Sequence, residues 1–243
     1  MRKIAIANRK GGVGKTTTAV NLAHGLSISG KRVLLIDTDT QGHCSRALGT
    51  KHPYGLAEVI EGVKNAPQST VEARSGLFLL PGGKKLGGTQ RLISRRNMRA
   101  EYTLLEALKP FENRYDFVIL DTPPGFNELS INVLFYASEV LVPVSMEILA
   151  LDGLKAFLEE VKGIREYSDI AVKYITPTFV DYRVKKTVEI LKLLQNHFKE
   201  LVTVPIRYSS RLSESPGWGK TIFEYDRTAK VAQDYAQLTK AML

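Results

Sequence analysis

The chain has 243 residues, 44% of them hydrophobic and 24% charged, and its 34 Lys and Arg against 25 Asp and Glu give a formal net charge of +9. This length supports a sizeable core in one large α/β domain or two small ones, and the composition excludes a chain that is disordered overall. The one cysteine, Cys44, excludes an intramolecular disulfide framework and a four-cysteine metal site within one chain, and it fits a reducing, cytoplasmic setting. The positive charge fits either a polyanionic partner such as nucleic acid or a solvated basic surface.

The chain shows no sign of a membrane segment or of a division into parts. No stretch approaches the roughly 18 consecutive apolar residues of a membrane span. The apolar run from Ile4 to Ala7 is too short for the hydrophobic region of a signal peptide. Repeats, low-complexity tracts and Pro/Gly/Ser-rich linkers are absent from the sequence. We therefore expect a soluble protein that is not secreted, with residues 1–243 forming a single domain.

Short apolar segments predict the strands of a sheet. In chain order they are Lys3–Asn8, Arg32–Asp37, Leu77–Leu80, Phe117–Asp121, Val140–Val144, Ala171–Ile175 and Leu201–Val204. Most are continuously apolar, which indicates strands covered on both faces, as in a parallel sheet. Segments with apolar residues at three- and four-residue spacing predict crossover helices at Thr16–Ser29, Ala100–Leu108, Leu154–Arg165 and Val184–Phe198. The pattern predicts an α/β fold, with a doubly wound, mostly parallel sheet flanked by helices. Thr50–Asn97, rich in Gly, Pro and basic residues, is the least regular region.

A glycine-rich loop follows the first predicted strand and runs into the first predicted helix, which is the context of a P-loop. Glycines without a Cβ let backbone N–H groups curve around phosphate oxygens, and the helix N-terminus adds partial positive charge. Lys15 is expected to bridge the β- and γ-phosphates of a nucleotide, and Thr16 to offer its hydroxyl to Mg²⁺. Arg9 stands where the strict motif has its first glycine, and Lys10 lies beside the glycines. The residues predicted to bind the nucleotide are Lys10, Gly11, Gly12, Val13, Gly14, Lys15, Thr16 and Thr17.

The segment Lys10–Thr17, K-G-G-V-G-K-T-T, resembles the deviant Walker A motif of the ParA/MinD family of P-loop ATPases, which is defined by an additional lysine at the position of Lys10. In that family the extra lysine reaches the nucleotide of the other subunit. The resemblance implies a face-to-face homodimer with ATP at its interface and Lys10 and Lys15 as catalytic residues. A cation supplied in trans acts like an arginine finger on the developing γ-phosphate charge. ATP would then join the two chains, and hydrolysis would release them.

Acidic residues stand at the ends of two predicted strands. Asp37 and Asp39 lie in I-D-T-D-T-Q-G, and Asp121 ends F-V-I-L-D. Ligands of doubly wound sheets bind beyond the carboxyl ends of the strands, so these carboxylates are expected to converge with the P-loop. Asp121 follows four apolar residues, as a Walker B aspartate does, and is predicted to hold Mg²⁺ through water together with Thr16. The alternative is that Asp and Thr simply end the strands in turns.

By the family resemblance, Asp39 positions the attacking water and contacts the Mg²⁺ shell, and Asp37 is the other aspartate of the pair in the nucleotide site. The family usually has proline at the position of Thr40 and asparagine at that of His43, two departures that bear on the flexibility of the first switch. Thr122–Asn127 is expected to be the second switch, where backbone groups sense the γ-phosphate. Pro205 lies near the family's adenine contact, although the local alignment is offset.

The resemblance extends into the C-terminal half. Leu141–Leu154 looks like the family's segment after the second switch, and Ser210–Ile222, S-R-L-S-E-S-P-G-W-G-K-T-I, is similar to the C-terminal signature of the small chromosomal ParA proteins called Soj. The resemblance implies that Arg211 and Arg183 contribute to nonspecific DNA binding. Two lysines beside Arg183 would add to the same patch, Lys185 and Lys186. Phosphate contacts need charges and no base reading. The alternative is a solvated basic surface.

Other conspicuous residues receive structural interpretations. Trp218, between two glycines, is expected to pack under a loop, and Cys44 is expected to have no chemistry. An ordinary exposed helix face is the first interpretation of the basic run Arg91, Arg95, Arg96 and Arg99.

The favoured prediction is a Mg²⁺-dependent ParA-type ATPase that dimerises with ATP and binds double-stranded DNA nonspecifically. A ParB-like centromere-binding protein and DNA would stimulate its slow hydrolysis, and cycling would partition chromosomes or plasmids in the cytoplasm at the nucleoid. No helix-turn-helix segment precedes the first strand, so specific operator binding is not expected.

Three alternatives use related chemistry. A MinD-like division-site regulator needs an amphipathic membrane helix, whereas Ala229–Leu243 has an apolar stripe with few cations, which predicts a helix packed on the domain and no stable membrane association. A reductase resembling the nitrogenase iron protein needs cluster cysteines, and Cys44 is alone and misplaced for that role. A ParA-like ATPase that positions another cargo would share the same nucleotide site.

Overall fold

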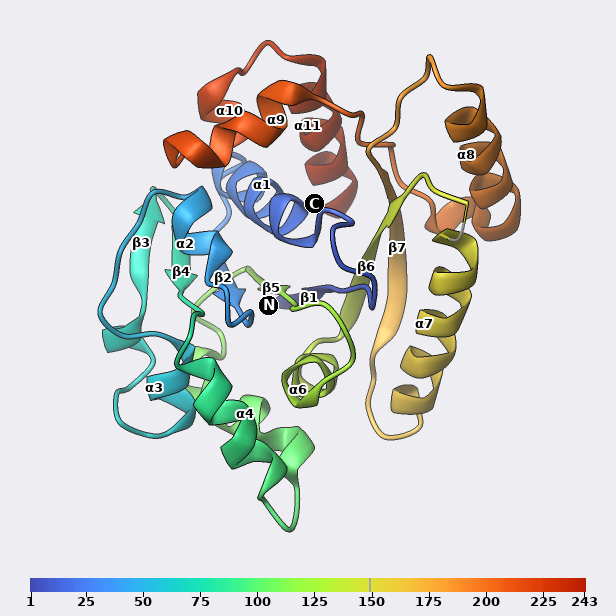
Figure 1. Ribbon diagram of the computed structural model, residues 1–243. Helices are drawn as coiled ribbons and strands as arrows, with labels where there is room; N and C mark the ends of the chain where they lie inside the picture. Colours follow the sequence, from blue (N-terminus) through green and yellow to red (C-terminus); the bar gives the residue numbers. More distant parts are fainter. Residues whose placement is uncertain (149) are drawn as a thin grey trace.

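The computed structural model describes residues 1–148 and 150–243, so that Leu149, within the Leu141–Leu154 segment, lies outside the described residues. In this part of the chain one seven-stranded sheet has the order β3-β4-β2-β5-β1-β6-β7 (Figure 1). Its strands are β1 (Arg2–Ile6), β2 (Val33–Asp37), β3 (Val71–Arg74), β4 (Leu77–Leu80), β5 (Phe117–Asp121), β6 (Glu139–Ser145) and β7 (Ala171–Thr178). All neighbouring strands pair in parallel except β3 and β4. The predicted α/β fold with a mostly parallel sheet is confirmed.

The continuously apolar strands are covered on both faces. In β2, Val33 and Leu35 pack into one core cluster, whereas Leu34 and Ile36 pack into the other. Every residue of β2 and β5 is buried. Because alternate side chains of a strand point to opposite faces, a strand between two helical layers needs apolar residues at every position.

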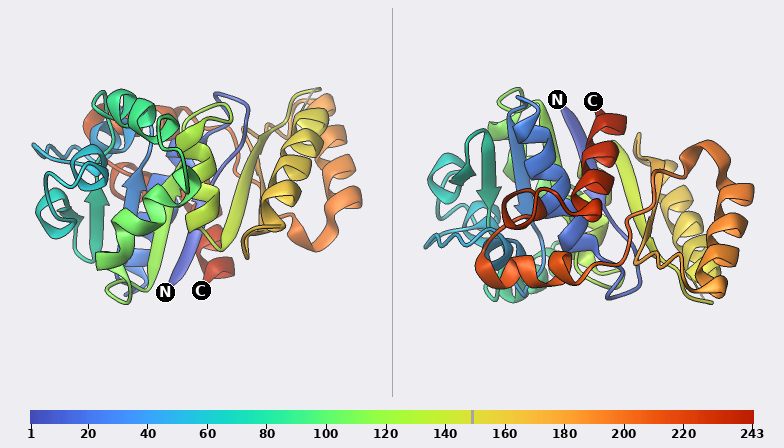
Figure 2. Two further views of the ribbon diagram at one scale, coloured as in Figure 1. Left: turned by 90° about the horizontal axis from the view of Figure 1, so that it is seen from below. Right: turned by 90° about the horizontal axis from the view of Figure 1, so that it is seen from above.

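Helices cover each face of the sheet (Figure 2). On one face lie α1 (Lys15–Ile28), α2 (His43–Ala47), α9 (Ser210–Glu214), α10 (Ile222–Tyr225) and α11 (Lys230–Met242). The second core cluster includes residues of α3 (Leu56–Ile60), α4 (Leu86–Ser94), α5 (Thr103–Leu108), α6 (Glu128–Tyr136), α7 (Ala150–Arg165) and α8 (Lys185–Phe198). Single 3₁₀ turns are η1 (Pro67–Ser69), η2 (Ala100–Tyr102), η3 (Lys109–Phe111), η4 (Lys199–Leu201) and η5 (Ser215–Trp218). The four predicted helices correspond to α1, η2 with α5, α7 and α8.

The predicted strand at Leu201–Val204 is wrong. This segment ends η4 and then runs extended beside β7, where Val202 forms an isolated bridge with Ile175. Lys199 has a φ of 38°, and Pro205 has no N–H to donate to a ladder. A short apolar run between these two residues is therefore left without regular pairing.

Two further expectations about the C-terminal region have opposite outcomes. Helix α11 buries Val231, Tyr235, Leu238 and Met242, each at most 1% exposed, so the predicted packed helix is confirmed. The prediction that Trp218 packs under a loop is wrong, because its side chain is 72% exposed. None of the helices in residues 1–148 and 150–243 has both the length and the apolar character needed to cross a bilayer.

Candidate nucleotide-binding site

The loop between β1 and α1 has the backbone geometry of a phosphate cradle. Gly12 has a φ of 73° and Gly14 a φ of 88°, values that strain any residue with a Cβ. Gly14 is the N-cap of α1 and has no side chain to occupy the first N–H groups of the helix. Asn8 braces the loop, because its Nδ2 donates to the Pro143 oxygen at 2.8 Å and its Oδ1 accepts from the Lys10 N–H at 3.0 Å. The loop is thus preformed for an anion.

A cavity of about 580 Å³ opens beside this loop. Its walls come from the P-loop glycines, the start of α1, the segment Asp39–Gln41 in the predicted first switch, and residues of the predicted second switch, Thr122–Asn127. Gln90 of α4 and Phe179 after β7 complete the walls. A cavity of this size at the carboxyl ends of the strands is the position and volume that a nucleotide requires.

Lys15 is 7% exposed at the base of the cavity, and its Nζ donates to the Lys10 carbonyl oxygen at 2.9 Å. Burial lowers the pKa of Lys15, and the charges of Asp121 and Asp39 oppose this shift. A buried ammonium is stabilised by an anionic partner. The phosphates of a nucleotide in this cavity would supply that partner.

Asp121 ends β5 and is completely buried beside the start of α1. Its Oδ1 has no hydrogen-bond partner among the described residues, and its Oδ2 is 3.4 Å from the Cys44 Sγ. Burial raises the pKa of Asp121, as does the charge of Asp37, while the nearby Thr16 hydroxyl lowers it. The unpaired carboxylate oxygen of Asp121 and the nearby hydroxyl of Thr16 are hard oxygen ligands, which Mg²⁺ prefers. These two residues therefore fit a Mg²⁺ ion.

Asp37 organises the first switch. Its Oδ1 accepts from the Asp39 N–H at 2.9 Å and its Oδ2 from the Cys44 N–H at 3.0 Å. Burial raises the pKa of Asp37, and these two backbone hydrogen bonds lower it. One donor atom each of Asp37, Cys44 and Asp121 lies within 4.8 Å of the others. The predicted contact of Asp37 with the nucleotide stays a prediction.

Asp39 lines the cavity and is 8% exposed, with its Oδ1 accepting from the Gln41 N–H at 3.0 Å. Its carbonyl oxygen accepts from the Gly83 N–H at 3.0 Å. A Cβ on Gly82 would stand 2.7 Å from the carbonyl oxygens of both Asp37 and Asp39, so this position requires glycine. Gly82 and Gly83 were not among the predicted site residues, although the Pro-Gly-Gly triplet directly after a predicted strand indicates a turn at this point.

The predicted second switch contacts both the P-loop and β1. The Gly125 N–H donates to the Arg9 oxygen at 2.9 Å, and the Thr122 hydroxyl donates to the Ile6 oxygen at 2.9 Å. Asn127 caps α6 by accepting from the Ser130 N–H at 3.0 Å. The predicted second switch therefore lies between the phosphate cradle and the N-terminus of α6.

Two of the eight P-loop residues predicted to bind the nucleotide, Lys10 and Val13, do not line the cavity. Lys10 is outside the cavity wall, with a side chain that is 40% exposed and paired with Glu147 after β6. Val13 is 2% exposed, and its carbonyl oxygen accepts from the Thr178 hydroxyl at 2.9 Å. The structure thus brings Lys15 together with the P-loop glycines and the carboxylates, and keeps Lys10 at the rim.

A smaller cavity of about 80 Å³ adjoins the P-loop and is the candidate site for the base. Its walls include Gly14, Phe179 and the segment 206–209. Pro205 does not belong to the walls of either cavity, so the structure favours the residues that follow it, and an adenine contact by Pro205 stays a prediction. Arg207 fixes this segment through two 2.7 Å hydrogen bonds to Asp234 of α11.

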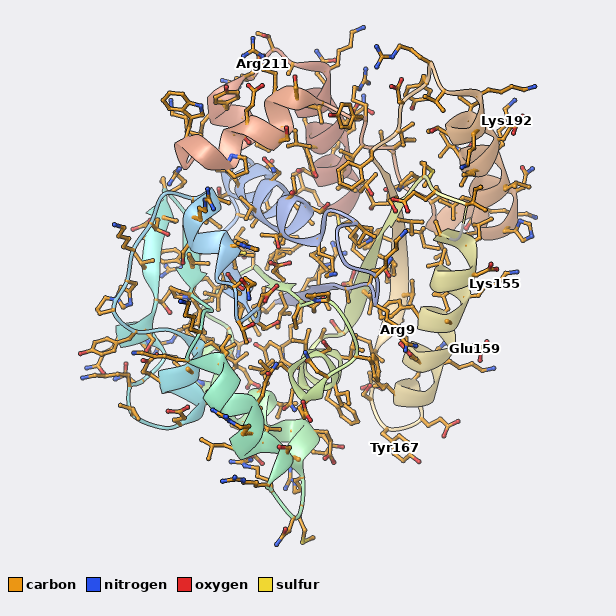
Figure 3. All side chains as sticks on the ribbon, in the orientation of Figure 1. Arg9, Lys155, Glu159, Tyr167, Lys192 and Arg211 are labelled. Carbon is orange, nitrogen blue, oxygen red and sulfur yellow. The ribbon has the colours of Figure 1, made fainter. Side chains whose placement is uncertain are left out.

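The predicted DNA contacts lie on one side of the molecule, on the loop before α8, on α8 itself and on α9 (Figures 1 and 3). The side chains of Arg183, Lys185 and Arg211 are 85%, 93% and 59% exposed, and Lys186 is exposed as well. The Arg183 guanidinium is held by Asp181 at 2.9 and 2.7 Å, which lowers the pKa of that carboxyl to about 2. This pairing orients Arg183 and offsets part of its charge.

Comparison with known proteins agrees with this geometry. Residues 1–174 match the model of a family described as an AAA domain. The chromosome partitioning protein ParA of Caulobacter vibrioides is 33% identical over 100% of this chain and 94% of its own length, and the chromosome-partitioning ATPase Soj of Thermus thermophilus is 37% identical over 100% and 96%. The chain belongs to the ParA/MinD family. Within it, the chain is similar to the Soj proteins.

Solved structures match over the whole chain. Cobyrinic acid a,c-diamide synthase from Mycobacterium smegmatis, with a bound ATP analogue and magnesium, has a TM-score of 0.84 at 30% identity and covers 100% of this chain and 94% of its own. An ATP complex of a McdA variant from Cyanothece has a TM-score of 0.88 at 24% identity over 100% and 96%, which shows the fold alone. This chain is a ParA-like ATPase whose cofactors are ATP and Mg²⁺.

Proposed function

We propose that this ParA-like ATPase forms an ATP-dependent sandwich dimer, binds double-stranded DNA nonspecifically as that dimer, and hydrolyses ATP to partition chromosomes or plasmids. Residues 1–243 act as one ATPase domain in this proposal. The observation that carries it is the position of Lys10. Its ammonium lies at the exposed rim and is held by Glu147, outside the cavity that its own loop builds. A lysine so placed is available to a second nucleotide site that faces the first.

In the proposed site, the P-loop N–H groups and Lys15 hold the phosphates, and Thr16 and Asp121 hold Mg²⁺. The ion supplies positive charge that stabilises the phosphate oxygens. Asp39 contacts the Mg²⁺ shell and orients a water, with its carboxylate already fixed at the cavity wall by the Gln41 N–H. Lys10 of the facing subunit adds a second cation where charge develops, and the reaction is complete only when two chains meet.

We further propose that a ParB-like protein and DNA stimulate hydrolysis, and that the protein works in the cytoplasm at the nucleoid. Support comes from the chromosome-partitioning names of the relatives and from exposed cations on one side of the chain. A MinD-like membrane cycle is disfavoured, because the apolar stripe of α11 is buried in the core. A ParA-like ATPase that positions another cargo remains the second candidate, since it would use the same site.

Substitutions of Lys10 and of Lys15 are expected to have different effects on nucleotide binding and on dimerisation. Lys15→Ala is expected to abolish ATP binding, whereas Lys10→Ala is expected to bind ATP as a monomer and to lose both dimerisation and hydrolysis. Size-exclusion chromatography with ATP, together with phosphate release, measures both properties. Arg9→Ala, next to Lys10 but outside the proposed chemistry, is the control. Normal hydrolysis by Lys10→Ala would exclude the role in trans.

DNA binding is tested in the same preparation. Wild-type protein should bind duplex DNA with ATP and release it with ADP. In a plot of the logarithm of the binding constant against the logarithm of the salt concentration, the slope should be about −0.9 for each phosphate contacted. Asp39→Ala should accumulate the ATP-bound dimer on DNA, because the water is no longer oriented. Equal binding with ADP and with ATP would contradict the proposal.

A further inference from the structure

Trp218, the one tryptophan of the chain, is exposed at the end of a helical segment. Its side chain is 72% exposed at the last position of η5, and η5 continues directly from α9, which carries Arg211. An indole buries a large apolar area when it finds a partner, so leaving it in water forgoes a stabilising contact. The rest of this segment is anchored normally, since Leu212 is 7% and Ser215 is 1% exposed.

The backbone that carries Trp218 is held in place. Gly219 ends η5 with a φ of 63°, and its carbonyl oxygen accepts from Arg74 Nη2 at 2.9 Å. Arg74 also donates through Nη1 to the Leu48 oxygen at 3.1 Å, just beyond α2. A Cβ on Gly219 would lie 2.7 Å from the Cα of Gly49, so the two glycine backbones are in close contact. The indole is therefore presented from a fixed position rather than from a loose loop.

Two cations lie on segments next to Trp218: Lys220 follows it by two residues, and Arg46 lies on α2, which packs against η5. Lys220 and Arg46 both line a groove of about 510 Å³ between α1, α2 and the α9–η5 segment. Neither has an ion-pair partner within 4.0 Å in the described part of the chain. Arg211 is only loosely paired, at 3.8 Å from both Glu214 and Asp226. An exposed aromatic ring among available cations is suited to a polyanion that also offers apolar surface.

We propose that Trp218 is a DNA contact: the indole packs against deoxyribose in the minor groove of duplex DNA, while Lys220 and Arg46 contact the flanking phosphates. This inference rests on the proposed DNA-binding function and adds a nonionic contact to it. Apolar side chains contact the minor groove without base-specific hydrogen bonds, so the contact suits nonspecific binding. A lipid surface fits less well, because membrane association needs an apolar stripe, and the neighbouring Leu212 is buried.

The single tryptophan makes the contact directly measurable. With wild-type protein, a nonhydrolysable ATP analogue and duplex DNA, emission excited at the red edge of the indole absorption should shift to the blue. Acrylamide quenching should fall at the same time, because the ring leaves water. Neither change should occur with ADP or without DNA. The same titration with vesicles of phosphatidylglycerol and phosphatidylcholine should leave the emission unchanged.

Variants separate the apolar contact from the ionic ones. Trp218→Ala should lower DNA affinity about tenfold, as for loss of an aromatic nucleic-acid contact, with an unchanged salt slope. Trp218→Phe should recover part of this loss. Lys220→Ala should instead make the salt dependence of DNA binding shallower, with the magnitude of the log-log slope lower by about one. Tyr167→Ala is the matched control, because Tyr167 is 71% exposed and lies at the opposite edge of the molecule from Arg211 (Figure 3). All four variants should keep the DNA-independent ATPase rate.

The outcomes distinguish this inference from the function on which it rests. Absence of ATP-dependent DNA binding by wild-type protein would defeat the proposed function. Normal wild-type binding with unchanged Trp218 emission, and with undiminished affinity of both Trp218 variants, would overturn only the inference. An emission shift with vesicles but not with DNA would overturn it too and would assign the ring to a membrane.

Discussion

Asp121→Asn should make the nucleotide-free protein more stable. The carboxyl is completely buried at the end of β5 and one of its oxygens has no partner in the described part of the chain. Burial, reinforced by the neighbouring Asp37, raises its pKa to about 8. The native protein therefore holds this carboxyl protonated at neutral pH, whereas the unfolded chain ionises it. The asparagine side chain of the variant has nearly the same shape as the protonated carboxyl, but it does not titrate, so folding does not require it to bind a proton.

The magnitude follows from the difference in proton binding. Keeping a carboxyl with an unfolded pKa of about 3.9 protonated at pH 7 costs about 4 kcal/mol. The amide avoids this cost but brings an N–H₂ group that must find an acceptor, at a cost of about 1–3 kcal/mol. We expect a net gain of about 2 kcal/mol, or roughly 5 °C in Tm for a chain of this size.

Chemical and thermal unfolding between pH 5 and 8, with and without Mg²⁺ and ATP, measure the effect. Because the native state binds the extra proton, wild-type stability should fall as pH rises through this range, by up to about 1.4 kcal/mol per unit from this group, and Asp121→Asn should lack that contribution. Mg²⁺–ATP at about one hundred times its Kd should add about 2.7 kcal/mol to the wild type. The stabilisation of Asp121→Asn by the same concentration of Mg²⁺–ATP should be clearly smaller, because the variant lacks the proposed Mg²⁺-binding carboxylate. A variant that is less stable than the wild type without nucleotide, or that has the same pH slope, would refute the reasoning.

Three other substitutions probe the site's surroundings. Gly82→Ala would place a Cβ 2.7 Å from two carbonyl oxygens of the first switch and should lower the free energy of unfolding by about 2 kcal/mol or more, as measured with urea. Arg207→Ala leaves the Asp234 carboxylate, 4% exposed, without its partner and should cost about 2 kcal/mol in a circular-dichroism melt; an unchanged Tm would show that the pair contributes nothing. Glu147→Gln releases Lys10 and should let the ATP dimer form at lower protein concentration in sedimentation velocity, with Glu159→Gln as an exposed control.

The parts of the fold that follow from local pattern were predictable. Runs such as Val33–Asp37 are apolar at every position because both faces of the strand are covered, and this feature alone indicates a central parallel strand. The P-loop is equally local, since Gly12 and Gly14 need positive φ and the lysine follows at once. Asp121 could be placed because a strand end precedes it directly.

The parts of the fold and of the site that could not be predicted depend on contacts between distant segments of the chain. β3 and α4 lie in Thr50–Asn97, where glycines and prolines hide the periodicity, and β3 is an antiparallel edge strand of only four residues. Gln90 reaches the cavity wall only because α4 lies beside it in space. No pattern within η5 reveals that Trp218 is exposed, because the residue that follows it, Gly219, packs against Gly49 in a distant part of the chain.

Long-range contacts also explain why the geometry of the first switch could not be predicted from its own residues. The first switch is held from three sides: Asp37 binds its backbone from β2, the Gly82–Gly83 turn packs against it from β4, and Arg74 fixes the chain just beyond α2. Each of these contacts is a hydrogen bond or a close approach to main-chain atoms. The backbone position of the first switch therefore depends more on these glycines and this arginine than on the side chain of Thr40. Substitutions at Gly82 or Arg74 should accordingly disturb ATP hydrolysis more than substitutions at Thr40, whose hydroxyl makes only a 3.5 Å contact with Asp39.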